Sequence, residues 1–390
     1  MIRQTRRWPS RCSVPLLLAL TAPAPAATLQ DALSGALARA APDTETTLPE
    51  ASSWLAAVPT VAGSHTETRA ARGTDETGVS LNLPIKSGTR RRLDRALREL
   101  ETRSAGLYTR FRQWVYSEPV RERAWAYRLA MLDLDAASEK QALLARLAEQ
   151  FSRQAASGAI PVYSSLIVER ARLDAELALD AARLAVRREQ DAFTALTGLA
   201  EVPGALTEVA PQTPAYDEHP ALRRLELDRA RERTVLHLSA PDTASWNLSL
   251  VARSFEGPEF TDEQLELAFE VPLNFLGTQS TGNRSQRSAA RRAYLLARDR
   301  LRLALRDRWR ALVTEGERLA RRQTLLQQAA GIADRIEAQI SALKTRNEIE
   351  GEIRLQRMLD VLETRAALAR TQALRGRNIA RKRQAAGLAL

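Results

Sequence analysis

The sequence predicts a mainly α-helical protein with a small β part, built as an internal twofold repeat. Ala, Leu and Arg dominate a chain of 390 residues in which aromatic residues make up only 5%, a composition typical of long helices and coiled coils. Four short segments instead alternate apolar and polar residues with a period of two, which indicates strands. The same order recurs in both halves: a helix, a β-hairpin and two long antiparallel helices.

The first 27 residues predict a secretory signal peptide. The stretch from Arg3 to Arg11 is basic, residues 14–22 are apolar, and the alanines that follow offer a cleavage site after Ala26. The apolar run is too short to span a bilayer as a helix. The only cysteine, Cys12, lies inside this segment. We therefore expect an exported mature chain without thiol or disulfide chemistry.

The first repeat is expected to cover residues 28–198, after which prolines mark a linker at 199–218. Its elements are, in order, a short amphipathic helix at 28–42, strands at about 59–68 and 77–85, and long helices at about 88–156 and 162–199. Gly158 falls in the break between the two long helices. We therefore expect Gly158 at the tip of an antiparallel helical hairpin.

The second repeat, residues 219–390, has the same order. Its elements are a helix at 219–238, strands at about 245–255 and 264–273, and long helices at about 282–344 and 351–383. Pro272 matches Pro84 at an offset of 188 residues, and Gly351 matches Gly158 at an offset of 193, which places Gly351 at a second tip. His219 precedes Pro220 at a helix start, where a capping role is expected.

A strict seven-residue spacing in the second repeat predicts the seam of a coiled coil. Its members are Leu312, Leu319, Leu326, Ala333 and Ile340.

Each strand is about ten residues long, the length of a tilted strand that crosses a bilayer, and has one apolar and one polar face. The residues expected on a lipid-facing surface are Val79, Leu81, Leu83, Trp246, Leu248, Leu250, Leu265, Leu267, Phe269 and Val271. The residues expected on a water-filled lumen are Ser80, Asn82, Asn247, Ser249, Glu266 and Glu270.

Four strands cannot close a barrel, and open strand edges are not tolerated in hydrocarbon. Three chains of four strands would supply a twelve-stranded barrel wide enough to enclose a channel, with the long helices forming a coiled-coil tunnel beneath it. The alternative is a pair of small hairpins that cap a helical bundle in the periplasm. The signal peptide, the strand length and the doubled order favour the shared barrel.

The doubled order resembles that of the TolC family of outer-membrane channel proteins, and four segments carry the resemblance. They are TLQDALSGALARAAP (28–42), HPALRRLELDRARE (219–232), the strand-to-helix passage at 271–297, and EGEIRLQRMLDVLETRAALARTQ (350–372). In order and spacing they cover nearly all of residues 28–385. A departure is the short helix before the first hairpin, where the family usually has a longer one.

The resemblance implies a homotrimer with a shared barrel in outer-membrane lipid and a helical tunnel in the periplasm. The channel would be a passive exit duct in efflux or type I secretion. A periplasmic adaptor protein and an inner-membrane pump would be its partners, with the adaptor touching the helix tips at 153–165 and 346–358. Acidic rings often stand at the periplasmic entrance in this family, which makes Asp360 and Glu363 gate candidates, although Arg357 takes one expected acidic position.

Other functions fit the sequence less well. The three histidines lie in different elements without metal-ligand spacing, and no nucleophile elbow, P-loop or dinucleotide fingerprint is present. We therefore expect no enzyme, no metal and no cofactor. Four arginines of the predicted signal peptide contribute to the net charge of +11, and elsewhere the arginines are interleaved with acids, which indicates solvated helix faces and no nucleic-acid partner. A soluble periplasmic coiled-coil adaptor or scaffold is the alternative function, and the sequence selects neither a cargo nor a pump class.

Overall fold

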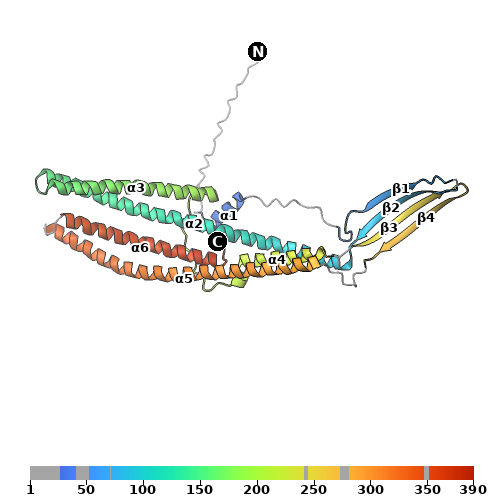
Figure 1. Ribbon diagram of the computed structural model, residues 1–390. Helices are drawn as coiled ribbons and strands as arrows, with labels where there is room; N and C mark the ends of the chain where they lie inside the picture. The colour runs from blue at the N-terminus through green and yellow to red at the C-terminus, as the bar shows by residue number, and fades with distance from the viewer. Residues whose placement is uncertain (1–26, 41–51, 71, 241–244, 273–280, 347–350) are drawn as a thin grey trace, which may run out of the picture.

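The computed structural model describes residues 27–40, 52–70, 72–240, 245–272, 281–346 and 351–390. The predicted signal peptide lies outside these residues except for Ala27. The described chain is mainly helical and carries one small sheet at one end of an elongated body (Figure 1). This architecture confirms the fold class that the sequence predicts for the single chain.

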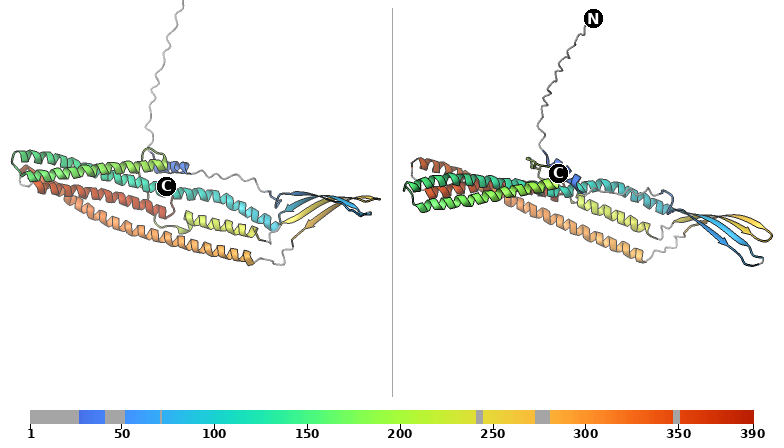
Figure 2. Two further views of the ribbon diagram at one scale, coloured as in Figure 1. Left: turned by 45° about the horizontal axis from the view of Figure 1, so that its top comes forward. Right: turned by 90° about the horizontal axis from the view of Figure 1, so that it is seen from above.

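Four long helices lie side by side and form the body (Figure 1, Figure 2). They are α2 (Gly88–Ala156), α3 (Val162–Thr197), α5 (Thr281–Arg346) and α6 (Gly351–Ala385). α2 packs against α3 on one side and α6 on the other, and α6 packs in turn against α5. The order across the body is therefore α3, α2, α6, α5, which leaves α3 and α5 at its two edges. At 1.5 Å per residue, α2 is roughly 100 Å long.

Two shorter helices pack on this body. α1 (Leu29–Arg39) lies against α2 and α3, and α4 (Pro220–Leu238) lies against α2 and α5 in the half nearer the sheet (Figure 1). A capping box starts α1, because Asp31 N–H donates to Thr28 Oγ1 while Thr28 N–H donates to Asp31 Oδ2. The side-chain and backbone hydrogen bonds of Thr28 lower the pKa of Asp31.

A glycine allows α1 to approach α3 closely. A Cβ at Gly35 would lie 2.1 Å from the backbone carbonyl oxygen of Thr197. We expect Gly35→Ala to lower the unfolding free energy by about 1–3 kcal/mol, because a clash with backbone cannot be relieved by a side-chain rotation. The measurement is urea unfolding followed by circular dichroism.

Gly331→Ala is the matched control for this substitution. A Cβ at Gly331, on the exposed surface of α5, meets no atom within 4 Å. This variant should be more stable by roughly 0.5–1 kcal/mol, since alanine is the better helix former. If both substitutions had the same effect on stability, α1 would not approach α3 as closely as the structure shows.

His219 caps α4, as its place before Pro220 predicts. Its Nδ1 accepts a hydrogen bond from the N–H of Ala221 at 3.2 Å, and its ring meets Trp114 edge-on with 4.9 Å between ring centres. The side chain is 1% exposed, and its Nε2 has no hydrogen-bond partner among the described residues. Burial, with a contribution from the nearby Arg308 guanidinium, lowers the pKa of His219 to about 4.

We expect His219 to make the folded protein sensitive to acid. The pKa of His219 falls from 6.5 to about 4 on folding. Its contribution to the unfolding free energy is therefore complete above pH 6.5 and is lost as the pH falls toward 4. In this window the unfolding free energy should fall by about 1.4 kcal/mol per pH unit through this group. Urea unfolding of the wild type and of His219→Gln across the window measures the difference. Parallel pH profiles for the two proteins would contradict the assignment.

The hairpins of the two repeats join in one antiparallel sheet of order β1-β2-β3-β4. The strands are β1 (Thr60–Thr66), β2 (Asp75–Ile85), β3 (Trp246–Glu256) and β4 (Thr261–Glu270). β2 pairs with β3 across the repeats, from Asp75 opposite Glu256 to Ile85 opposite Trp246. β1 and β4 lie at the edges, and each has one side without a partner strand among the described residues.

The strand ends differ from those expected. β2 begins at Asp75 and β4 at Thr261, because cross-strand pairing continues from Asp75 through Glu256 to Thr261 and shortens the connections. β1 ends at Thr66, and β4 ends at Glu270. Val271, expected on the apolar face, therefore lies just beyond the sheet.

The linker at 199–218 packs into the centre of the body. Leu206 is 6% exposed and belongs to a core cluster that includes Val120, Trp125 and Phe193. The same cluster includes Ala373 and Ala380 of α6, so the linker contributes to a core shared by the two repeats.

A buried ion pair fixes the same linker to α2. Arg121, which is 2% exposed, donates to both carboxylate oxygens of Glu208, Nε to Oε1 at 2.9 Å and Nη2 to Oε2 at 2.7 Å. Its Nη1 donates to Gln384 Oε1 and to the carbonyl of Leu388. Arg383 also approaches Glu208, at 2.8 Å. One guanidinium therefore joins the linker, α2 and the C-terminal residues.

Candidate functional site

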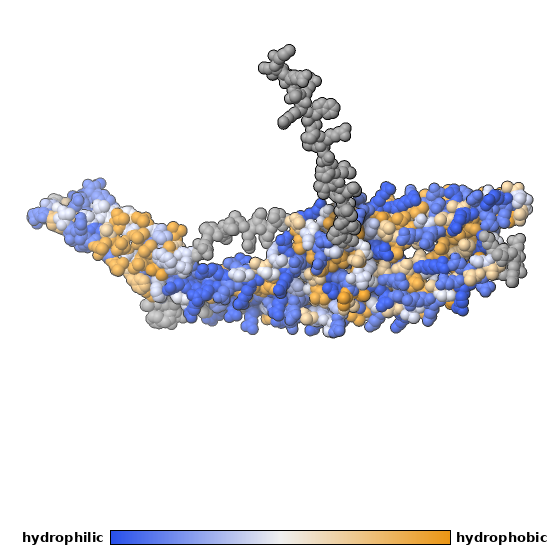
Figure 3. Space-filling model, turned by 180° about the vertical axis from the view of Figure 1, so that it is seen from behind, coloured by the Kyte–Doolittle hydropathy of each residue, from blue (hydrophilic) through white to orange (hydrophobic). Residues whose placement is uncertain are grey.

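The strand register sorts the sheet into an apolar and a polar face. Directly opposed residues share a face, and Leu81 lies opposite Leu250, which lies opposite Leu267. The apolar face carries nine of the ten residues expected to meet lipid: Val79, Leu81, Leu83, Trp246, Leu248, Leu250, Leu265, Leu267 and Phe269. Five of its side chains are exposed in the single chain, with Leu265 75% exposed, and the other four are half-buried. A continuous exposed apolar face of this kind marks an interaction surface (Figure 3).

The polar face carries a hydrogen-bonded row across the middle strands. Ser249 Oγ donates to Asn82 Oδ1 at 2.7 Å, and Asn247 Nδ2 donates to Ser249 Oγ at 3.4 Å. Ser80, Glu266 and Glu270 lie on the same face. Ser80 and Glu266 stand opposite Val251, two residues after Ser249, and Glu270 stands opposite Asn247. All six residues expected on a lumen surface therefore share one face.

Arg253 occupies this polar face and was missed by sequence reasoning. It lies 3.5 Å from Glu76 of β2 and 3.3 Å from Glu266 of β4. The alternation of β3 puts Arg253 on its polar side, but the approach of Glu76 depends on the pairing of β2 with β3 between the repeats. The face therefore carries bridged charges of both signs.

The two helical hairpins end close together at the other end of the body (Figure 1). Gly158 has a positive φ of 75° after α2, and the N–H groups of Gly158 and Ala159 donate back to the carbonyls of Ala155 and Gln154, a Schellman motif. Gly351 is the first residue of α6, and a Cβ there would lie 2.7 Å from the ring of Phe151. Of the second tip, expected at 346–358, residues 347–350 lie outside the described residues.

Hydrogen bonds join the start of α6 to the first hairpin. Ser164 Oγ of α3 donates to Glu352 Oε1 at 2.6 Å, and Arg354 donates to Gln150 Oε1 of α2 at 3.3 Å. The described ends of the two hairpins are thus packed and bonded to one another.

Both gate candidates lie on α6, and both are paired. Asp360 accepts a hydrogen bond from Arg357 at 3.2 Å within α6, with both side chains 53% exposed. Glu363 accepts one from Lys140 of α2 at 3.2 Å. The acid at position 360 is therefore offset by the arginine that replaces an expected acid, while Glu363 bridges the two hairpins.

Further ion pairs continue this link along α6. Arg370 pairs with Asp133 of α2, and Arg377 and Arg381 both pair with Glu122 of α2. Burial alone would raise the pKa of Glu122, but the hydrogen bonds and charges of these two arginines outweigh it and lower that pKa. Arg365 reaches to α5 instead, at 2.7 Å from Asp334. Ion pairs therefore hold α6 to both of its neighbours, α2 and α5.

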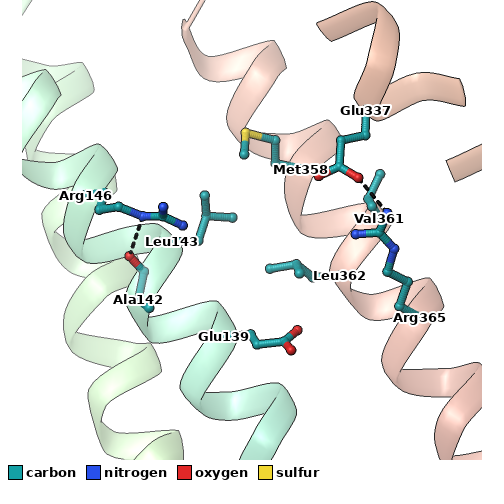
Figure 4. A pocket seen from close by; sticks show the side chains of 9 residues that line it. All are labelled: Glu139, Ala142, Leu143, Arg146, Glu337, Met358, Val361, Leu362 and Arg365. Carbon is teal, nitrogen blue, oxygen red and sulfur yellow. Dashed lines mark hydrogen bonds and ion pairs between the residues drawn. The ribbon is translucent and has the colours of Figure 1, made fainter. Parts of the chain in front are cut away.

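A groove opens between the hairpins near their tips, with a cavity volume of about 360 Å³ (Figure 4). Leu143 of α2 faces Met358 and Leu362 of α6 across it, so its floor is apolar. Charged side chains surround this floor. Among them, the carboxylate of Glu139 makes no ion pair or hydrogen bond with a described residue.

The two edge helices expose apolar stripes. On α3, Leu177 is 71% and Leu184 is 69% exposed. Each precedes a buried residue, Leu179 or Val186, by two positions and therefore lies on the opposite side of the helix. On α5, Leu325 is 60% and Ile332 is 50% exposed. Both stripes run at a seven-residue spacing, which is the pattern of a helix that packs against another helix.

Solved structures share this arrangement. The CmeC outer membrane channel of Campylobacter jejuni is 13% identical, with a TM-score of 0.62 over 92% of this chain and 82% of that one. The outer membrane protein VceC of Vibrio cholerae is 14% identical, with a TM-score of 0.62 over 85% and 86%. The fold is TolC-like. The MtrE outer membrane channel of Neisseria gonorrhoeae, solved in its open state, is 14% identical, with a TM-score of 0.55 over 85% and 81%.

The TolC-like fold is thus recognised through structure. No protein-family model matches the sequence, and comparison with curated proteins gives no match. None of the described helices of this TolC-like chain is both long and apolar enough to cross a membrane. Its described part also has no group of three or more His, Cys, Asp or Glu side chains placed to hold a metal ion.

Proposed function

We propose that the chain is one subunit of a homotrimeric outer-membrane channel, in which three four-stranded sheets close a twelve-stranded barrel. The observation that carries the proposal is the sheet itself. It has a continuous exposed apolar face, a polar face and two open edges. A barrel shared between copies gives each of these a partner: lipid, water and the next strand. CmeC and MtrE, which have this fold, are themselves outer membrane channels.

The helical body supports the same closed ring. Its free edges, α3 and α5, carry different apolar stripes, so an interface between copies joins unlike surfaces. Interfaces of this kind generate a ring when the rotation closes. Three bodies joined in this way would form a helical tunnel that continues from the barrel into the periplasm.

In this proposal the channel is a passive exit duct of a tripartite efflux or type I secretion system. A periplasmic adaptor protein would dock at the hairpin tips around Gly158 and Gly351 and deliver substrates from an inner-membrane pump. The groove of about 360 Å³ near these tips has an apolar floor and a charged rim, which suits an amphipathic helix. Asp360 and Glu363 would stand at the tunnel entrance.

The gate role of Glu363 rests on a weak bond. Its pair with Lys140 is solvent-exposed, with side chains 66% and 40% exposed, and exposed pairs contribute roughly 0–1 kcal/mol. Such a link holds two hairpins together yet can be released by a docking partner.

The decisive experiment separates a channel from a soluble scaffold. Membranes and periplasm are fractionated, the protein is extracted with detergent, and its mass is determined by light scattering corrected for bound detergent. We expect a trimer from the outer-membrane fraction that produces stable conductance steps in a planar bilayer. A soluble monomer or dimer in the periplasm would contradict the proposal and support the adaptor or scaffold alternative.

A further inference from the structure

A basic groove lies between α4 and α5 at their sheet-proximal ends. The cavity has a volume of about 840 Å³ and lies between the last turns of α4 and the first turns of α5. Five arginines line it: Arg229, Arg233, Arg284, Arg287 and Arg291. Glu226 is the one acid among its lining residues, and it is paired with Arg223 at 3.3 Å. We call this cavity the arginine groove.

Most of the positive charge of the arginine groove is not balanced within the described chain: of its five arginines, only Arg229 has an acidic partner there, Glu232 at 3.0 Å. The side chains of Arg233, Arg284 and Arg291 make no ion pair or hydrogen bond with any described residue. Arg287 follows Arg284 by three residues and precedes Arg291 by four, so three like charges lie on one helix face, which is destabilising. The Nε of Arg287 is buried without a hydrogen-bond partner among the described residues.

The sequence of α5 adds to this imbalance. Residues 281–298 contain five arginines and no acid. Acids are favoured at the start of a helix, where the helix dipole is positive, yet the first turn of α5 has none. A region that departs from its own local preference in this way is expected to meet an anion from outside the chain.

The position of the arginine groove indicates what that anion is. At the helical end of the sheet, Trp246 and Phe269 form an edge-to-face pair on the apolar face, 5.8 Å between ring centres. Aromatic side chains in such a place mark a membrane–water interface. Along α5, Arg284 to Arg291 span about 10 Å, close to the roughly 5–8 Å depth of a headgroup layer. Hydrophilic helix surface adjoins the apolar sheet in Figure 3.

We propose that the arginine groove binds the phosphate of an anionic phospholipid headgroup in the membrane leaflet at the helical end of the sheet. The inference rests on the proposed function, which places the sheet in a bilayer. Guanidinium groups form paired hydrogen bonds with phosphate oxygens, and basic pockets beside membrane segments recognise anionic headgroups. A lipid also has acyl chains that can lie along the apolar face above the groove.

The test is native mass spectrometry of the full chain in detergent, with phosphatidylglycerol, phosphatidylcholine or soluble glycerophosphoglycerol added at equal concentration. We expect phosphatidylglycerol to bind most tightly. The variant Arg233→Gln/Arg284→Gln/Arg291→Gln should bind it about tenfold more weakly or worse, since each arginine near a headgroup contributes several-fold in affinity. The matched control, Arg187→Gln/Arg321→Gln/Arg322→Gln, removes the same charge from exposed α3 and α5 positions far from the sheet and should bind like the wild type.

Each other outcome overturns a defined statement. Unchanged phosphatidylglycerol binding by the groove variant, or equal losses of binding in the groove and control variants, would show that the arginine groove is not the binding site. Equally tight binding of glycerophosphoglycerol would assign the groove to soluble anions and reject the lipid. A trimer that conducts but shows no lipid preference would overturn this inference alone. A soluble protein that forms no trimer would overturn the proposed function together with it.

Discussion

Replacing Glu208 by Gln is expected to lower the unfolding free energy by about 3–5 kcal/mol, although the two side chains have nearly the same shape. Glu208 neutralises Arg121, which is buried with 2% exposure and donates to both of its carboxylate oxygens. The amide would leave a guanidinium charge in the centre of the body without its counter-charge. The measurement is urea unfolding of the detergent-solubilised protein, followed by circular dichroism.

Two further variants make this prediction specific. Glu169→Gln removes an exposed carboxylate from an ion pair with Arg172 on α3 and should leave the unfolding free energy unchanged within measurement error. Arg121→Met/Glu208→Leu removes both buried charges and should cost less than Glu208→Gln alone, because only Arg383, whose side chain is 24% exposed, then loses its counter-charge. Similar losses in the single and double variants would mean that the ion pair is not the cause.

The central ion pair shows what a periodic pattern cannot reveal. Arg121 stands among charged residues on α2, where interleaved Arg and Glu predict a solvated face. It is buried because residues 199–218 fold back over α2, a contact between positions 87 residues apart. Proline content identified this stretch as a linker, but composition does not say on which surface a linker packs.

The elements themselves follow from local periodicity. A period of two placed Leu81, Leu250 and Leu267 on one side of their strands, and the register then aligns them across three strands. A period of seven marked Leu319, Ala333 and Ile340, all of which are buried. These signals are readable because apolar residues recur on the same face of one element along its length.

The partner of Glu363 was not readable from the sequence, for the same reason as the central pair. Glu363 meets Lys140 across 223 residues, and that contact depends on α6 packing beside α2. Arg357, in contrast, meets Asp360 three residues away on the same helix. The sequence contained this pair, and helical spacing would have identified it.

The second large effect is expected at the edges of the helical body. Leu177 and Leu184 of α3 are 15 and 22 residues from the start of that helix at Val162, whereas Ile332 and Leu325 of α5 are 14 and 21 residues from its end at Arg346. The two stripes therefore lie at the same depths from the hairpin tips, about 22 and 32 Å. In a ring of three copies, α3 of one copy would meet α5 of the next, Leu177 against Ile332 and Leu184 against Leu325. Leu177→Glu/Leu184→Glu should then abolish the trimer, measured by light scattering in detergent.

The size of this effect follows from repetition. Each leucine that leaves an interface loses about 1.5–3 kcal/mol, and a closed ring contains the interface three times. Because both leucines are about 70% exposed in the single chain, its helix content and stability should change little.

Val209→Glu is the matched control, since Val209 is 79% exposed but lies in the linker away from both stripes. Adding Leu325→Lys/Ile332→Lys should restore the trimer by placing opposite charges at equal depth. A glutamate variant that stays trimeric, or a lysine addition that restores nothing, would show that α3 and α5 do not meet.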